Sequence, residues 1–141
     1  MKAMILAAGR GKRMMPLTAQ LPKPMLCVAG KPLIEHHIMR LKAAGITQIV
    51  INLAWQGDKI KTYFADGSAW GVSITYSQEV TGGLETAGGI IQALPLLGES
   101  FIVINGDVYS DYDISALMQL HLQPKEAHIV LVENPAHNPE G

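Results

Sequence analysis

Cations and glycines gather in the loop that follows an apolar run over residues 3–8. Gly9 and Gly11 give the backbone access to positive φ and let a ligand approach it closely. Three side chains add positive charge to the same span: Lys12, Arg13 and Lys23. Backbone amides and cations in one loop form a cradle for an anion, so this segment predicts a polyphosphate site.

A carboxylate follows a second apolar run. Residues 101–105, FIVIN, lead directly into Gly106 and Asp107. Mg²⁺ is typically held in proteins by one or two carboxylates together with substrate phosphates, so Asp107 is a candidate magnesium ligand. An Asn-Gly-Asp sequence is also typical of a turn that ends a strand, and the residues alone leave both interpretations open.

Glycines also crowd residues 78–89, QEVTGGLETAGG, ahead of a predicted helix. Free backbone N–H and C=O groups where a helix begins can contact the edge of a nucleobase. Any one of these glycines can equally serve only as a turn former or a packing point. The segment is therefore a candidate base-binding loop.

Two familiar phosphate loops do not fit the first motif. A Walker A loop requires Ser or Thr after its Gly-Lys pair, but Arg13 follows Gly11-Lys12 and Leu6 stands where the first glycine belongs. The dinucleotide pattern GxGxxG has Met14 at its third glycine, and a proline-containing stretch follows in place of an immediate helix. The chain is therefore not a P-loop protein, and a dinucleotide-dependent oxidoreductase is a weak alternative.

The composition of the chain further limits the classes of protein to which it can belong. The 141 residues, 48% of them hydrophobic, amount to one domain with a sizeable core. A formal net charge of −1 argues against a nucleic-acid partner, which usually needs a basic face. The five histidines show no paired metal-binding spacing, so zinc is not implied.

The apolar stretch before Gly9 is too short for a secretory signal, and cations follow it at once. No apolar run approaches the roughly 20 residues that a membrane helix requires. The single Cys27, between Leu26 and Val28, predicts a small buried side chain in a reducing compartment. We expect a cytoplasmic protein with no membrane partner. The sequence does not indicate an oligomeric state.

Apolar runs alternate with segments of helical periodicity, a pattern typical of an α/β fold with a parallel sheet covered by helices. The predicted strands cover residues 2–8, 48–52, 72–77, 101–105 and 128–133. The first predicted helix begins at Pro32 and stops before Gly45. The others cover residues 58–64, 85–94 (ended by Pro95) and 113–122, with Asp113 as N-cap. Ligand sites of such sheets form at the carboxyl ends of the strands, where the three loops described above are expected to lie.

LAAGRGKRMMPLT (residues 6–18) followed by PKPM (residues 22–25) resembles the signature of the sugar-phosphate nucleotidyltransferases. The resemblance implies a Rossmann-like, mostly parallel sheet with helices on both faces, the nucleotide-diphospho-sugar transferase fold. It also implies a single nucleotidyltransferase domain over residues 1–141 that joins a nucleoside triphosphate to a sugar 1-phosphate with Mg²⁺. In the family, Arg13 would hold the phosphates, Lys23 would stabilise charge during the reaction, and Asp107 would bind the metal. The implied nucleotide-binding residues are Leu6, Ala7, Ala8, Gly9, Gly11, Arg13, Lys23, Glu79, Gly83, Thr86 and Gly106.

Further stretches, including NLAW (residues 52–55), LETAGG (84–89) and INGDVYSDYD (104–113), resemble the bacterial members that use UTP and N-acetylmuramate 1-phosphate in cell-wall recycling. Relatives that use mannose 1-phosphate with GTP, or glucose 1-phosphate with dTTP or UTP, share the same motifs and stay as alternatives. Glu85 departs from the glycine that many relatives carry. The family continues past Gly141, so a truncated chain that binds nucleotide without completing the reaction is expected. A non-catalytic nucleotide-sensing module is the alternative from another class.

Overall fold

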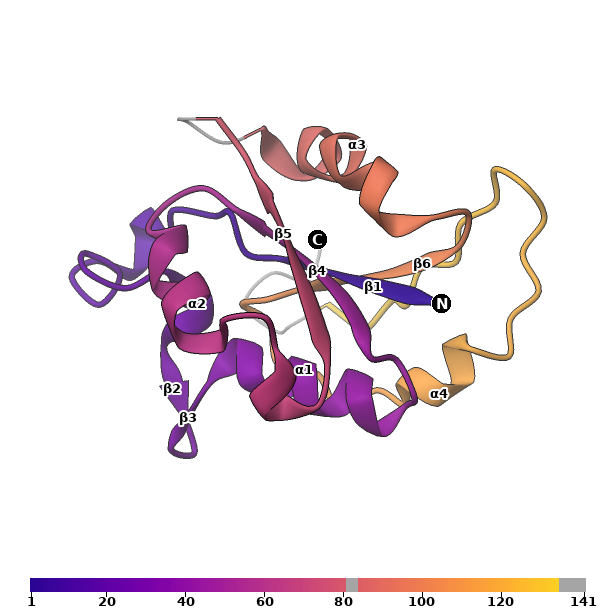
Figure 1. The fold of residues 1–141 in the computed structure, drawn as a ribbon, viewed down its shortest axis with the longest axis horizontal. Coiled ribbons are helices and arrows are strands. Elements are labelled where there is room, and N and C mark those ends of the chain that lie inside the picture. Colours follow the sequence, from indigo (N-terminus) through magenta and orange to yellow (C-terminus); the bar gives the residue numbers. More distant parts are fainter. Residues whose placement is uncertain (81–83, 135–141) are drawn as a thin grey trace.

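Four parallel strands form the central sheet of the computed structural model, which describes residues 1–80 and 84–134. Their spatial order is β5-β4-β1-β6 (Figure 1). The strands are β1 (Lys2–Leu6), β4 (Gln48–Leu53), β5 (Ser73–Gln78) and β6 (Phe101–Asn105). The chain runs outward from β1 through β4 to β5 and then returns to the other side of β1. The winding therefore reverses between β1 and β6, and a crevice at the carboxyl ends of these two strands is the usual ligand site of such sheets.

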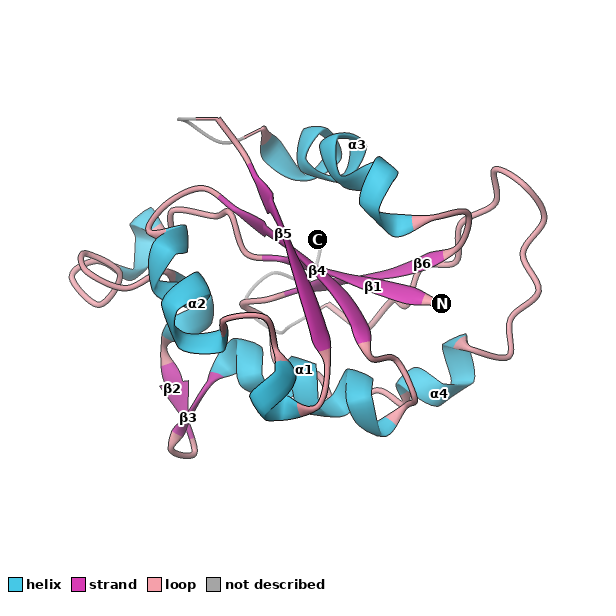
Figure 2. Ribbon diagram, in the orientation of Figure 1, coloured by secondary structure: helices cyan, strands magenta, loops and turns pink. Residues whose placement is uncertain are grey.

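Helices cover both faces of the sheet (Figure 2). One face carries α1 (Leu33–Ala43), α2 (Gly57–Phe64) and the short α4 (Ile114–Leu117), whereas α3 (Glu85–Leu97) lies alone on the other. Three 3₁₀ turns, η1 (Lys12–Met14), η2 (Lys23–Met25) and η3 (Ser68–Trp70), lie in the loops. A small antiparallel hairpin, β2 (Cys27–Val28) and β3 (Lys31–Pro32), precedes α1.

Alternation along the strands divides the core into two layers. In β4, Ile49 and Ile51 face the layer under α1 and α2, while Val50 faces α3. In β1, Ile5 and Met4 divide in the same way, and both are fully buried. Each such side chain contributes about 1.5–3 kcal/mol on burial, so both layers hold β1 firmly at the centre of the sheet.

The structure confirms the predicted α/β fold with a parallel sheet and helices on both faces. The helix expected after Pro32 begins at Leu33, and Gly45 follows it with φ +84°. Asp113 is the N-cap of α4, since its Oδ1 accepts a hydrogen bond from the Ser115 amide at 2.9 Å.

Two helix predictions were wrong at their C-terminal ends. The predicted helix over residues 113–122 ends at Leu117, because its first turn packs on the core through Ile114 while Leu120 and Leu122 are exposed. Conversely, α3 continues through Pro95 to Leu97, which is 1% exposed. Burial of that last turn offsets the hydrogen bond that proline removes.

The predicted strand over residues 128–133 does not form in the described part of the chain. Ile129 and Leu131 are 71% and 83% exposed, so the apolar pattern alone did not define a strand without a paired neighbour. The prediction that Cys27 is buried was also wrong. The thiol is free and exposed on the β2–β3 hairpin, because both residues of β2 are exposed. No helix within residues 1–80 and 84–134 is long and apolar enough to cross a membrane.

Candidate active site

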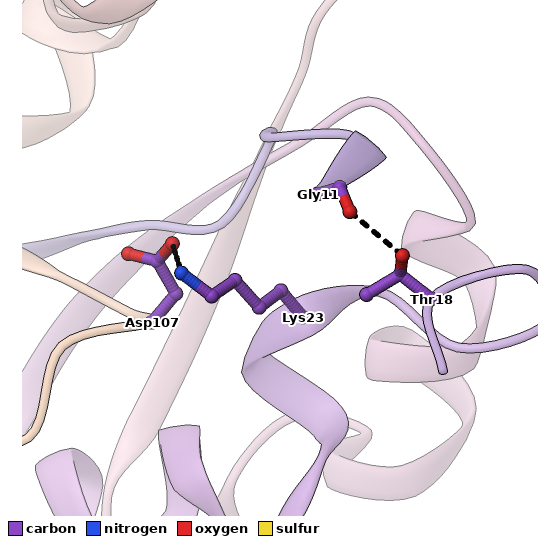
Figure 3. A network of polar contacts seen from close by, with 4 residues as sticks. All are labelled: Gly11, Thr18, Lys23 and Asp107. Atoms are coloured by element: carbon purple, nitrogen blue, oxygen red, sulfur yellow. Dashed lines mark hydrogen bonds and ion pairs between the residues drawn. The ribbon is translucent and has the colours of Figure 1, made fainter. Parts of the chain in front are cut away.

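The side chains of Lys23 and Asp107 meet at the carboxyl ends of β1 and β6 (Figure 3). Lys23 Nζ donates to Asp107 Oδ2 at 2.8 Å, and the two side chains are 31% and 37% exposed. Lys23 begins η2, which closes with a hydrogen bond of 2.8 Å from the Met25 amide to the Pro22 carbonyl. The buried Pro24 and Met25 anchor this turn, so the ammonium projects from a fixed backbone toward the solvent-accessible carboxylate.

Gly106 allows the loop after β6 to lie directly against β1. Its amide donates to the Leu6 carbonyl at 2.9 Å. A Cβ at this position would lie 2.8 Å from the same Leu6 oxygen and 3.0 Å from Ile5 Cγ2. Only glycine fits without displacing backbone, and this close approach places Asp107 beside the loop that leaves β1.

The glycine-rich loop turns back on itself through Gly11, which adopts φ +62°. Thr18 Oγ1 donates to the Gly11 carbonyl at 2.7 Å (Figure 3), and Thr18 is only 1% exposed. Gly9 and Arg13 are exposed, the latter on η1. Arg13 takes part in no ion pair within residues 1–80 and 84–134. The loop thus exposes Gly9 and the Arg13 cation to solvent, while the hydrogen bond from the buried Thr18 fixes its backbone at Gly11.

Arg10 lies over the indole of Trp55, with the guanidinium carbon 4.6 Å from the ring centroid. This cation–π contact joins the loops after the neighbouring strands β1 and β4. Neither residue was a candidate site residue from the sequence. Both residues follow strands that pair in parallel. That pairing was the one signal from which their contact could have been predicted.

In the loop after β5, Glu79 is 5% exposed and its carboxylate is engaged inside the protein. Glu79 Oε1 accepts from Asn52 Nδ2 at 2.6 Å, and Oε2 accepts from the Leu84 amide at 2.8 Å. Thr86 is exposed in the first turn of α3, and Gly83 lies outside the described residues. No hydrogen bond or ion pair between described residues links Thr86 to Lys23 or Asp107.

Glu85, the first residue of α3, adopts φ +58°. This left-handed conformation is costly for a residue with a Cβ and is readily adopted by glycine. The backbone geometry at this position therefore suits glycine better than the glutamate that the chain carries.

A buried imidazole lies under the loop that carries Asp107. His37 of α1 is 1% exposed, and neither ring nitrogen makes a hydrogen bond of normal geometry with a described residue. Burial, followed by the nearby charges of Arg40 and His36, lowers the pKa of His37 below its usual 6.5. The Asp107 carboxylate and the Val108 backbone act in the opposite direction by smaller amounts. The neutral form of the ring is therefore favoured beneath the candidate site.

The described residues contain no group of three or more His, Cys, Asp or Glu side chains able to enclose a metal ion. Asp107 alone is a poor cage, but one carboxylate next to the glycine-rich loop is compatible with Mg²⁺, which takes most of its remaining ligands from water and substrate phosphates. The donor set thus fits a magnesium ion that arrives with a nucleotide.

The fold and the side chains described above define an α/β protein with a candidate phosphate-binding site at the junction of β1 and β6. The chain matches the family described as "Nucleotidyl transferase" over residues 2–141, and it belongs to that family. This membership confirms the resemblance found in the sequence.

Individual relatives are consistent with the family. The chain is 62% identical to the N-acetylmuramate alpha-1-phosphate uridylyltransferase of Neisseria meningitidis, over 100% of this chain and 63% of that protein. It is 39% identical to the UTP--glucose-1-phosphate uridylyltransferase of a Synechocystis strain, over 86% of this chain and 34% of that protein. The structure of HddC from Yersinia pseudotuberculosis complexed with GMP-PN superposes with a TM-score of 0.74 and 28% identity, covering 84% of this chain and 52% of that one. The chain thus spans less than two thirds of the length of these relatives.

Proposed function

We propose that this protein is a sugar-1-phosphate uridylyltransferase that joins UTP to N-acetylmuramic acid 1-phosphate, giving a UDP-sugar and pyrophosphate in peptidoglycan recycling. The observation that carries the proposal is the contact between Lys23 and Asp107 next to the glycine-rich loop. A cation and a metal-binding acid at one point are what a reaction between two polyanions requires. The name of the 62% identical Neisseria relative supports the choice of base and sugar.

In the proposed reaction, an oxygen of the sugar phosphate attacks the α-phosphorus of UTP. The bond from the α-phosphorus to the bridging oxygen breaks, and pyrophosphate leaves with that oxygen and its electron pair. The attacking oxygen is already an anion, so no covalent enzyme nucleophile is needed. The protein's task is to position the two substrates and to offset their negative charge.

Several described residues of the site have a part in this scheme. The backbone at Gly9 and Gly11 cradles the phosphates, and the exposed Arg13 adds a cation that no other described residue pairs with. Lys23 neutralises charge that develops on the α-phosphoryl oxygens and the leaving group. Mg²⁺ held by Asp107 and the nucleotide phosphates would supply further neutralisation of phosphate charge. Thr86, which is exposed in the first turn of α3, would face the base.

A cytoplasmic location is part of the proposal. The one cysteine, Cys27, is a free and exposed thiol, which suits a reducing compartment. Nucleoside triphosphates as substrates fit the same compartment.

A thermal-shift panel tests the proposal directly. The four ribonucleoside triphosphates and dTTP are each added with Mg²⁺, alone and with a series of sugar 1-phosphates, and release of pyrophosphate is measured in parallel. We expect UTP with Mg²⁺ to raise the melting temperature more than any other nucleotide, because a ligand that binds only the folded state stabilises it. UTP with a chelator of divalent ions is the control.

The other outcomes discriminate between the alternatives. A preference for GTP or dTTP would favour a mannose- or glucose-1-phosphate enzyme. Binding without pyrophosphate release when both substrates are present would favour a nucleotide-sensing module. Stabilisation by NAD and by no nucleoside triphosphate would overturn the proposal.

A further inference from the structure

Asn52 and Glu79 form a continuous series of hydrogen bonds behind the candidate site, from the Ala7 amide to the Leu84 amide. Asn52 Oδ1 accepts from the Ala7 amide at 2.7 Å, and Asn52 Nδ2 donates to Glu79 Oε1 at 2.6 Å. Glu79 Oε2 in turn accepts from the Leu84 amide at 2.8 Å. The Glu79 amide also donates to the Leu53 carbonyl at 2.8 Å, next to the end of β4. The chain thereby ties together the ends of β1, β4 and β5 and the residue that precedes α3.

Burial makes these bonds significant. Asn52 is 2% exposed and Glu79 is 5% exposed, so an unpaired polar group at either position would cost free energy. Gly89 of α3 lies against the pair, since a Cβ there would be 2.4 Å from Glu79 Oε1 and 2.8 Å from Asn52 Nδ2. The helix thus covers the pair, and the Glu79 carboxylate faces protein groups on both oxygens.

The two amides that the pair holds belong to the two loops assigned to the nucleotide. Ala7 begins the glycine-rich loop, and Leu84 stands where the candidate base-binding loop meets α3. We propose that Asn52 and Glu79 are positioning residues, which set the phosphate loop and the base loop in register, and that the Glu79 side chain does not itself contact the nucleotide. This inference rests on the proposed function, and it replaces the direct contact expected of Glu79 from the sequence.

The direction of each hydrogen bond gives a sharp test. A backbone amide can only donate, so the Ala7 amide fixes an acceptor on residue 52 and the Leu84 amide fixes an acceptor on residue 79. Between the two side chains, residue 52 donates and residue 79 accepts. Asn52→Asp puts two carboxyl groups face to face, and Glu79→Gln puts two NH₂ groups face to face or turns one against a backbone amide. The double change Asn52→Asp with Glu79→Gln reverses the central bond and satisfies every group again.

The experiment compares the wild type, both single variants and the double variant for affinity toward UTP with Mg²⁺ and for melting temperature. Hydrogen exchange at the Ala7 and Leu84 amides is followed by NMR without nucleotide. We expect each single change to weaken UTP binding by about tenfold, within the range shown by coupled neighbours, and to speed exchange at both amides. The double variant should return to within about threefold of wild-type affinity.

Ser77→Ala is the matched control, because Ser77 is a buried polar residue of β5 outside this chain of bonds. It should leave UTP affinity and exchange at the two amides close to those of the wild type. If Glu79→Gln fails to fold, the double variant still decides, since restored folding and binding require the reversed bond.

Two results would overturn the inference while the proposed function stands, provided that the wild type binds UTP. In the first, the single variants bind UTP no more weakly than Ser77→Ala does. In the second, the double variant loses as much affinity as the two single variants combined. A wild-type protein that binds no nucleoside triphosphate would overturn the proposed function, and this inference with it.

Discussion

Lys23 and Asp107, which lie 84 positions apart in the chain, are joined by a 2.8 Å ion pair at the point where the winding of the sheet reverses. The pair is about one third exposed, so solvent screens it and it contributes little to stability. Its value lies in placement, because it holds a cation and an acid together at the carboxyl ends of β1 and β6. Lys23 stands on the η2 turn, which buried residues anchor, and Asp107 follows Gly106, where a Cβ would meet the Leu6 carbonyl oxygen.

Removing either member of this pair should impair function far more than folding. We expect Lys23→Ala and Asp107→Asn each to lower pyrophosphate release by at least about a hundredfold, as for the loss of one group that stabilises transition-state charge. Melting temperature should change little in both variants, because the pair is partly exposed.

Lys31→Ala is the control for loss of an exposed lysine, since Lys31 forms an ion pair with Glu35 away from the site. It should retain turnover. Near-normal turnover of Lys23→Ala or Asp107→Asn would remove that residue from the catalytic role. A large fall in melting temperature would instead assign it a structural one.

The approach of β6 to the loop after β1 should depend on Gly106. In Gly106→Ala the new Cβ meets the Leu6 carbonyl oxygen at 2.8 Å, and backbone must move to relieve the contact. We expect a loss of about 1–3 kcal/mol in the free energy of unfolding, measured with urea, as for other overpacked positions. Gly9→Ala is the stability control, because a Cβ at Gly9 meets nothing within 4 Å. Equal stabilities of the two variants would contradict the steric argument.

The sequence predicted the parts of the fold that local patterns determine. The strands β1, β4 and β6 are apolar runs, and β5 alternates polar and apolar residues. The helix α1 lies between Pro32 and Gly45. Residues 128–133 show the limit of that argument, since four consecutive apolar residues specify a strand only when a neighbouring strand can pair with them.

The candidate site, like the fold, was predicted only in part from the sequence. Glycines and cations near the start of the chain, and the Gly-Asp pair after β6, were evident from residue types and spacing. The Arg10–Trp55 stack and the Asn52–Glu79 bond were not, because each depends on which strand ends lie next to each other. Side-chain amides and carboxylates that bond inside a fold carry no periodic signal in the sequence.

Strain at the start of α3 predicts a stabilising substitution. Glu85 holds φ +58°, which disfavours a side chain, whereas glycine adopts it freely. Glu85→Gly should raise the free energy of unfolding by roughly 0.5–1 kcal/mol, the relief of strain less the extra entropy of an unfolded glycine. Ala87→Gly, two positions into the same helix, should lower it by about 1 kcal/mol. A loss of stability in Glu85→Gly would show that the left-handed conformation is not maintained in solution.

The buried imidazole of His37 predicts how stability depends on pH. Its pKa in the folded protein lies below the usual 6.5, chiefly because of burial and then through Arg40 and His36 on the same helix, with Asp107 and the Val108 backbone opposing. The imidazole of His37 therefore binds a proton more readily in the unfolded chain than in the folded protein. The stabilising contribution is complete above pH 6.5 and is lost as the pH falls through 6.5 toward the lowered folded pKa.

Urea unfolding at about pH 7.5 and about pH 5.5 measures this dependence. We expect the wild type to lose stability at the lower pH, and His37→Phe to lose less, because it has no imidazole to protonate there. His121→Gln is the matched control: His121 is exposed and is not among the groups that shift the pKa of His37, so the variant should keep the wild-type difference. An unchanged pH difference in His37→Phe would show that His37 is not the group whose protonation weakens the fold.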